Sequence, residues 1–180
     1  MYTTRKAVLK PIGGLLPVGQ HKVEIIEAAF ITSNAVVKRP WDDVTPQLKL
    51  VYKNENGVIT SWMNCKGYKN INDFVGGVAP KNHELRSFDE DSEKFLVDKK
   101  TNKRVESPER TEEMLQNVDR VAISAGVVEE GEDYDFNDLP NMLVGEMVGI
   151  KVIENKRGKV EVSFAMPVEA VKATAVAEQE

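Results

Sequence analysis

Residues 47–66 combine a tryptophan and several lysines in a pattern that could bind a single-stranded nucleic acid. Two alternating runs, residues 47–53 and 58–66, are joined by residues 54–57, and Asn56-Gly57 is a strong signal for a hairpin turn. With these two residues at the turn centre, one face of the hairpin collects Lys49, Lys53, Trp62, Asn64 and Lys66. Bases stack on aromatic rings while ammonium groups contact phosphates, so this face is suited to single-stranded nucleic acid.

The opposite face of the same hairpin is predicted to be apolar. The turn places Tyr52 opposite Ser61, Leu50 opposite Met63, and Leu48 opposite Cys65. Cys65 is the only cysteine and can form no internal disulfide, so we interpret it as a small buried hydrophobe rather than a nucleophile or ligand.

Further basic and aromatic residues lie outside the hairpin face. They are Lys38, Arg39 and Trp41 in the loop 32–45, Tyr68 after the hairpin, and Lys156 and Arg157 in the turn 155–158. Structural roles compete with binding. Trp62 could close a barrel core, Trp41 could cover an open barrel end, and the lysines could serve solubility and edge protection.

The charge distribution favours contact with nucleic acid by the first half of the chain. The net charge of the 180 residues is −5. Residues 1–81 carry 11 Lys and Arg against 6 Asp and Glu, whereas residues 82–180 carry 13 against 23. Such asymmetry is typical of a basic binding part and an acidic part that faces solvent or another protein.

Several function classes are disfavoured by what the sequence lacks. It has no apolar stretch long enough to span a bilayer and no signal-peptide pattern at its start, which predicts a soluble, cytoplasmic protein with no membrane partner. Its two histidines have no cysteine partners, and no metal or other cofactor is implied. No catalytic triad, Cys/His pair or phosphate-binding glycine loop is recognisable, so we expect no enzyme. The carboxylates of residues 129–135 lack the spacing of an EF-hand, which favours a solvated acidic loop.

The first half of the element pattern predicts a strand and an insertion around the hairpin. A strand is expected over residues 21–31, with a change of alternation at Ile25-Ile26 that indicates a β-bulge. Residues 82–106 are rich in charge and look like an insertion with a small hairpin over residues 95–105.

The second half predicts one helix and two closing strands. Ser107 is a good N-cap, Pro108 suits the first helical position, and Gly126 would end the helix. The helix would bury Met114, Leu115, Val118, Val121, Ala122 and Ala125. An acidic loop over residues 129–138 follows, in which Tyr134 and Phe136 could pack back onto the domain. Strands are expected over residues 146–153 and 159–166, the second with Val160, Val162, Phe164 and Met166 facing inward, and residues 168–180 form a flexible tail.

This order predicts a mainly β fold with one helix: an OB-fold-like five-stranded barrel of three strands, a helix and two strands, with a charged insertion. We expect a single domain over residues 1–180 with its core at about 16–167. OB-folds bind oligomers through the face of strands two and three and through the loops that join strands one to two and four to five. The basic and aromatic residues named above fall at all three places.

The sequence resembles the short phage-encoded single-stranded-DNA-binding proteins. Residues 16–28, Leu-Pro-Val-Gly-Gln-His-Lys-Val-Glu-Ile-Ile-Glu-Ala, look like the opening strand of that family, and residues 48–52, Leu-Lys-Leu-Val-Tyr, resemble its second strand. Residues 143–153 and 160–167 look like its closing hairpin. The chain departs from the family in its third strand, which has no clear Gly-Arg element, in the long insertion and in the weakly acidic end of the tail. The resemblance implies sequence-tolerant binding of single strands and formation of homo-oligomers.

The leading hypothesis is therefore non-catalytic, largely sequence-independent binding of single-stranded DNA in phage-type replication or recombination, in the cytoplasm of a host cell if the protein is phage-encoded. Replication or recombination proteins could bind its acidic segments. The alternative is a small β-rich virion or assembly protein that binds another protein through the same face.

Overall fold

The computed structural model describes residues 14–32, 46–70, 73, 85–87, 96–101 and 103–172. The chain divides into two compact units. The first comprises residues 1–29, 49–62 and 119–180, and the second comprises residues 30–48 and 63–118.

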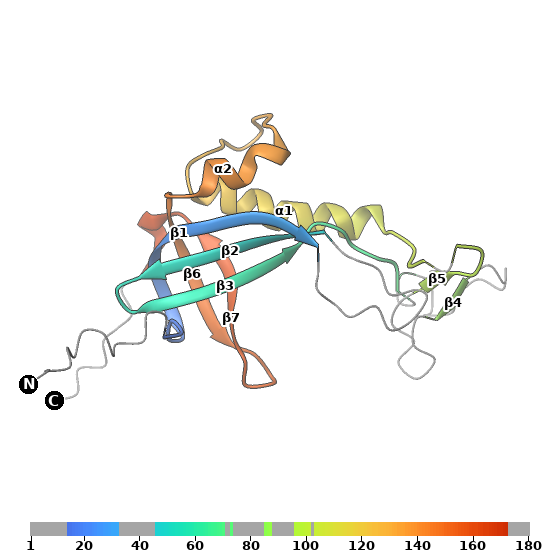
Figure 1. Ribbon diagram of the computed structural model, residues 1–180, viewed down its shortest axis with the longest axis horizontal. Helices are drawn as coiled ribbons and strands as arrows, with labels where there is room; N and C mark the ends of the chain where they lie inside the picture. The colour runs from blue at the N-terminus through green and yellow to red at the C-terminus, as the bar shows by residue number, and fades with distance from the viewer. Residues whose placement is uncertain are drawn as a thin grey trace, which may run out of the picture. The chain divides into compact units, whose positions relative to one another are not determined.

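A mainly β architecture is confirmed. Five antiparallel strands form one open sheet in the order β3-β2-β1-β6-β7 (Figure 1). Their bounds are β1 (Gly19–Thr32), β2 (Pro46–Asn54), β3 (Gly57–Asn64), β6 (Met147–Glu154) and β7 (Val160–Met166). A separate two-stranded sheet pairs β4 (Leu85–Ser87) with β5 (Leu96–Asp98). Within the described residues β3 and β7 are the two outer strands of the larger sheet, and no pairing between them closes it into a barrel.

Alternation of side chains builds the core on the inner face of this sheet. In β1, His21, Val23 and Ile25 are buried while Lys22 and Glu24 are exposed. The alternation changes after Ile25, as the sequence predicted. Inward residues of the neighbouring strands complete the layer: Leu48, Leu50 and Tyr52 of β2, Ile59 of β3, Val148, Ile150 and Val152 of β6, and Ala165 of β7. Burial of each large apolar side chain contributes about 1.5–3 kcal/mol.

The hairpin of β2 and β3 forms, but its turn lies one residue earlier than predicted. Glu55 and Asn56 are the turn residues, and the N–H of Asn56 donates to the Asn54 Oδ1 at 2.8 Å. The N–H of Cys65 donates to the carbonyl of Pro46 at 2.9 Å, so Pro46 lies opposite Cys65, where Leu48 was predicted. Each predicted pair is thus wrong by two residues, yet the faces are correct because a shift of two preserves the alternation.

The predicted inward position of Phe164 is wrong. The pairing of β6 with β7 is regular up to Val152 and Val162, and Lys151 then pairs with Phe164, so Ser163 is an extra residue in β7. Such a bulge reverses the face that the following side chains occupy. Phe164 is consequently 38% exposed and lies 5.6 Å from the Lys151 ammonium. Met166 shares the face of Phe164, opposite Gly149, although its side chain is buried.

The predicted helix is confirmed as α1 (Pro108–Ser124). The Ser107 Oγ accepts a hydrogen bond from the N–H of Arg110 at 3.3 Å, which is the expected N-cap contact. Val118, Val121, Ala122 and Ala125 are buried, whereas Met114 and Leu115 are half-buried. The first unit also contains elements that the sequence did not predict: a 3-10 turn, η4 (Phe136–Asp138), and a short helix, α2 (Leu139–Leu143), both within or after the expected acidic loop.

Two other segments were anticipated in part. The small hairpin within the insertion is present, because the N–H of Asp98 donates to the carbonyl of Lys103 at 2.9 Å and that of Val105 to the carbonyl of Leu96 at 3.0 Å. After β7, residues that we assigned to the flexible tail form a 3-10 turn, η5 (Val168–Ala170).

Among the described residues, no helix is both long enough and apolar enough to cross a membrane.

Candidate nucleic-acid interface

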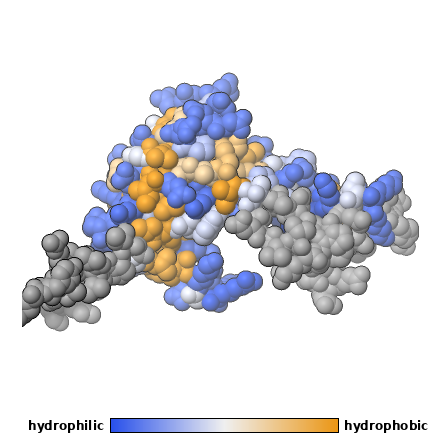
Figure 2. All heavy atoms as spheres, in the orientation of Figure 1, coloured by the Kyte–Doolittle hydropathy of each residue, from blue (hydrophilic) through white to orange (hydrophobic). Residues whose placement is uncertain are grey.

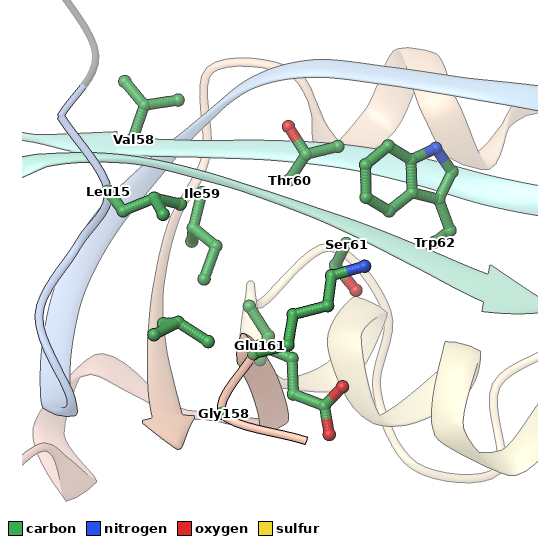
Figure 3. A pocket seen from close by; sticks show the side chains of 11 residues that line it. Leu15, Val58, Ile59, Thr60, Ser61, Trp62, Gly158 and Glu161 are labelled. Atoms are coloured by element: carbon green, nitrogen blue, oxygen red, sulfur yellow. The ribbon is translucent and has the colours of Figure 1, made fainter. Parts of the chain in front are cut away.

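A groove of about 660 Å³ lies between the two outer strands of the sheet (Figure 3). One wall is β3 and the other is β7 with the turn that precedes it. The lining residues are Leu15, Val58, Ile59, Thr60, Ser61, Trp62, Gly158, Lys159, Val160, Glu161 and Val162. All belong to the first unit. In Figure 2 hydrophobic side chains gather over the strands, with hydrophilic side chains around them. The groove therefore occupies the gap in the open sheet.

The beginning of the β3 edge is already paired with the chain. The N–H of Val58 donates to the carbonyl of Gly14 at 2.8 Å, and that of Leu16 donates to the carbonyl of Val58 at 3.3 Å. Gly57 permits this approach, because its φ is +153° and a Cβ there would lie 2.1 Å from the Gly14 oxygen. In an antiparallel strand the N–H and C=O groups of every second residue point to the same side. The backbone groups of Thr60 therefore point to the same edge of β3 as those of Val58, which is where the groove lies.

Trp62 is the one aromatic residue among the described residues that line this groove. It lies on the solvent face of β3, as the hairpin pattern predicted, and 52% of its surface is exposed. Its indole has no hydrogen bond or ring contact with any other described residue. Figure 3 shows the ring at one end of the β3 wall, away from Leu15 and Val58. The indole face is thus available for stacking with a planar ligand.

A basic turn forms the approach to the opposite wall. Asn155 shapes it, because its Oδ1 accepts hydrogen bonds from the N–H groups of Arg157 at 2.9 Å and Lys159 at 3.0 Å. Lys156, Arg157 and Lys159 are exposed and have no ion pair with another described residue. Lys156 and Arg157 were predicted from the sequence as site residues, whereas Lys159 was not. Lys159 directly follows the turn, at a position where the alternating pattern predicts a side chain facing solvent. That position could have identified it.

The other predicted cations differ in how far they are neutralised. Lys53 is exposed and has no ion pair with a described residue. Lys49 is bound to Glu27 at 2.8 Å, and Lys66 is bound to Glu106 at 2.5 Å. An ammonium group already paired with a carboxylate gains less from a phosphate, since the first partner must be displaced.

The remaining predicted site residues do not join the groove. Asn64 accepts a hydrogen bond from the Gln47 amide at 2.8 Å, and Tyr68 is buried with the Arg104 guanidinium 4.8 Å from its ring centroid. Tyr68 therefore has no free face for a base. Lys38, Arg39 and Trp41 lie outside the described residues.

Cys65 is half-buried rather than fully buried. Desolvation raises the pKa of its thiol, partly offset by a hydrogen bond from the Leu48 backbone. A raised pKa keeps the thiol protonated at neutral pH, which is unfavourable for a nucleophile or metal ligand. Among the described residues, no group of three or more His, Cys, Asp or Glu is placed to hold a metal ion.

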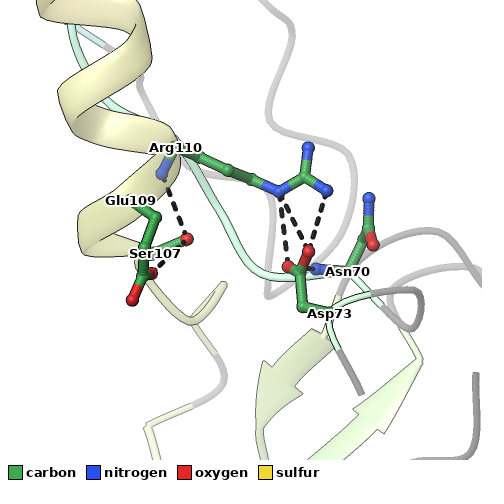
Figure 4. Close-up of polar contacts among 5 residues, drawn as sticks. All are labelled: Asn70, Asp73, Ser107, Glu109 and Arg110. Atoms are coloured by element: carbon green, nitrogen blue, oxygen red, sulfur yellow. Dashed lines mark hydrogen bonds and ion pairs between the residues drawn. The ribbon is translucent and has the colours of Figure 1, made fainter. Parts of the chain in front are cut away.

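A second, polar pocket of about 400 Å³ lies at the start of α1 within the second unit. Figure 4 shows the polar contacts made there by Asp73, Ser107 and Arg110. Arg110 donates to both oxygens of the Asp73 carboxylate, at 2.9 to 3.3 Å. The hydrogen bond from Arg110, together with one from the Asn70 N–H, lowers the pKa of Asp73. Asp73 and Arg110 thus bind each other, and Asp73 also accepts a hydrogen bond from the Asn70 backbone.

Comparison with protein-family models and with curated proteins gives no match for this chain.

Proposed function

We propose that the protein binds single-stranded DNA without catalysis and largely independently of sequence. The observation that carries the proposal is the exposed, unpartnered Trp62 in a groove whose other wall begins at the basic turn of Lys156, Arg157 and Lys159. A base would stack on the indole while the phosphates contact the turn and Lys53. Such a combination of ring and cations tolerates any base, because every base has a π face.

The strand order supports an OB-fold assignment within this proposal. With β4 and β5 set aside as an insertion, the chain runs through three strands, α1 and two strands, and β1 lies between β2 and β6. This is the order of an OB-fold, in which binding uses the face of strands two and three and the loop between strands four and five. Trp62 and the basic turn lie at those two places.

The biological setting is part of the same proposal. We place the protein in phage-type replication or recombination, in the cytoplasm, with homo-oligomers on the strand and with recruitment of replication or recombination proteins through its acidic segments.

Fluorescence anisotropy of a labelled mixed-sequence oligonucleotide tests the proposal. The protein is titrated at low and at moderate salt against the single strand and against the matching duplex. We expect tight, salt-sensitive binding that favours the single strand. No binding of the single strand at low salt would refute the proposal.

A second candidate function is binding of another protein through the same groove. The observation that favours it is the pair of outer strands β3 and β7, since an extended peptide can add to an unpaired sheet edge. Size-exclusion chromatography with and without the oligonucleotide separates the two functions, because only DNA binding predicts a complex with the oligonucleotide.

A further inference from the structure

Among the described residues that line the groove, Glu161 is the one acidic residue. It is exposed on β7, and Figure 3 shows its side chain on the wall that faces β3. The Asn155 amide donates to its Oε2 at 3.2 Å, and no described cation forms an ion pair with it. The second carboxylate oxygen, Oε1, has no hydrogen bond within the described residues and can accept one from a ligand.

A carboxylate is unfavourable beside a phosphate but favourable beside a hydrogen-bond donor of a base. Lys159 directly precedes β7 and stands two residues before Glu161, and both residues line the groove. Two residues of extended chain span about 6.6 Å. A nucleotide could then place its phosphate near Lys159 and its base edge near Glu161. Unpaired bases expose their Watson–Crick edges, and carboxylates accept from the exocyclic amino group of cytosine.

We propose that Glu161 accepts a hydrogen bond from the exocyclic amino group of a base stacked on Trp62, which makes the groove prefer amino-bearing bases over thymine. Thymine has no amino group and presents carbonyl oxygens, which the carboxylate repels. The inference rests on the proposed binding of single-stranded DNA and adds a modest base preference to it.

The test compares oligo(dC) with oligo(dT) of equal length at pH 8, where cytosine is unprotonated. Anisotropy titrations use the wild type, Glu161→Gln and, as a control with the same charge change, Glu130→Gln in an exposed loop outside the groove. We expect the wild type and Glu130→Gln to bind oligo(dC) about fivefold or more tightly than oligo(dT), since a hydrogen bond to a charged group is worth at least about that factor. Glu161→Gln should reduce the ratio to near one, because an amide can both donate and accept.

The outcomes separate this inference from the function on which it rests. Equal affinity of the wild type for the two oligonucleotides, or tighter binding of oligo(dT), would overturn the role of Glu161 and leave DNA binding intact. A preference that persists in Glu161→Gln would overturn it as well. If neither oligonucleotide binds the wild type, the proposed function itself fails.

Discussion

Two regions of this molecule contain an aromatic ring and basic side chains, and they use them differently. In the groove of the first unit, the Trp62 ring has no ring contact and the cations of the basic turn have no ion pair among the described residues. In the second unit, the Tyr68 ring is buried under Arg104, and Lys66 pairs with Glu106. The two regions have similar residue types, so composition alone does not distinguish them. They differ in whether each ring and each charge already has a partner within the protein, because only groups without a partner are available to a ligand.

The largest effect is expected from Trp62→Ala. Loss of one stacked base costs about 1–3 kcal/mol, so affinity for single-stranded DNA should fall by about 5- to 150-fold. Anisotropy titration measures it. Tyr68→Phe is the matched control in the second unit and should bind DNA like the wild type. An equal loss of DNA affinity in the two variants would contradict the proposed difference between the two regions.

Gly67→Ala should act on stability instead of on binding. A Cβ at Gly67 would lie 2.4 Å from the Arg110 Cβ and 2.6 Å from the Arg110 backbone carbon, at the start of α1. Overpacking of this kind costs about 1–3 kcal/mol. We expect a lower free energy of unfolding in urea with unchanged DNA affinity of the folded protein. An unchanged midpoint of urea unfolding would contradict the close approach of Gly67 to Arg110.

The basic turn should determine part of the salt dependence. Each cation that contacts a phosphate of a single strand adds about 0.7 to the magnitude of the slope of log K against log salt. The double variant Lys156→Ala/Arg157→Ala should therefore reduce that magnitude by about 1.4, as measured by titration at several salt concentrations.

Lys66→Ala is the control for the basic turn, because Lys66 is already paired with Glu106. It should leave the slope nearly unchanged. A reduction in Lys66→Ala as large as that per residue in the double variant would show that pairing within the protein does not decide which cations contact DNA.

The smallest effect is expected from Asp73→Asn. Arg110 lowers the pKa of Asp73 in the folded protein, so the carboxylate stabilises the fold above its unfolded pKa of about 4, and this stabilisation is lost as the pH falls through the folded pKa. Because the pair lies at the surface, its contribution at pH 7 is at most about 1 kcal/mol. The free energies of unfolding of the two proteins in urea should differ at pH 7, and this difference should shrink as the pH falls below about 4. A constant difference across this range would contradict the role of the charge.

Local patterns predicted much of the fold. Alternation identified the solvent face of Trp62, and Ser107 with Pro108 located the start of α1, because strand faces and helix caps depend on neighbouring residues. The helix α2 was missed because five residues do not make a periodic pattern. The bulge at Ser163 was missed because no glycine or proline marks it, and it turned Phe164 outward.

The candidate site was only partly predictable for the same physical reason. Residue type indicated which side chains could bind DNA, and Trp62, Lys156 and Arg157 do lie on or beside one groove. Sequence could not show that Lys49 pairs with Glu27, 22 residues earlier, or that Tyr68 is buried, because both depend on tertiary contacts. The groove itself arises from the separation of β3 and β7, which no local pattern encodes.

The most direct measurement is the fluorescence of Trp62 during DNA binding. In Trp41→Phe, Trp62 is the only tryptophan, and its emission is recorded while an unlabelled mixed-sequence single strand is added at low salt. Binding is followed in parallel by anisotropy of the labelled strand. We expect quenching that saturates together with binding, because a base stacks on the indole. Binding without any change in the emission of Trp62 would contradict the account.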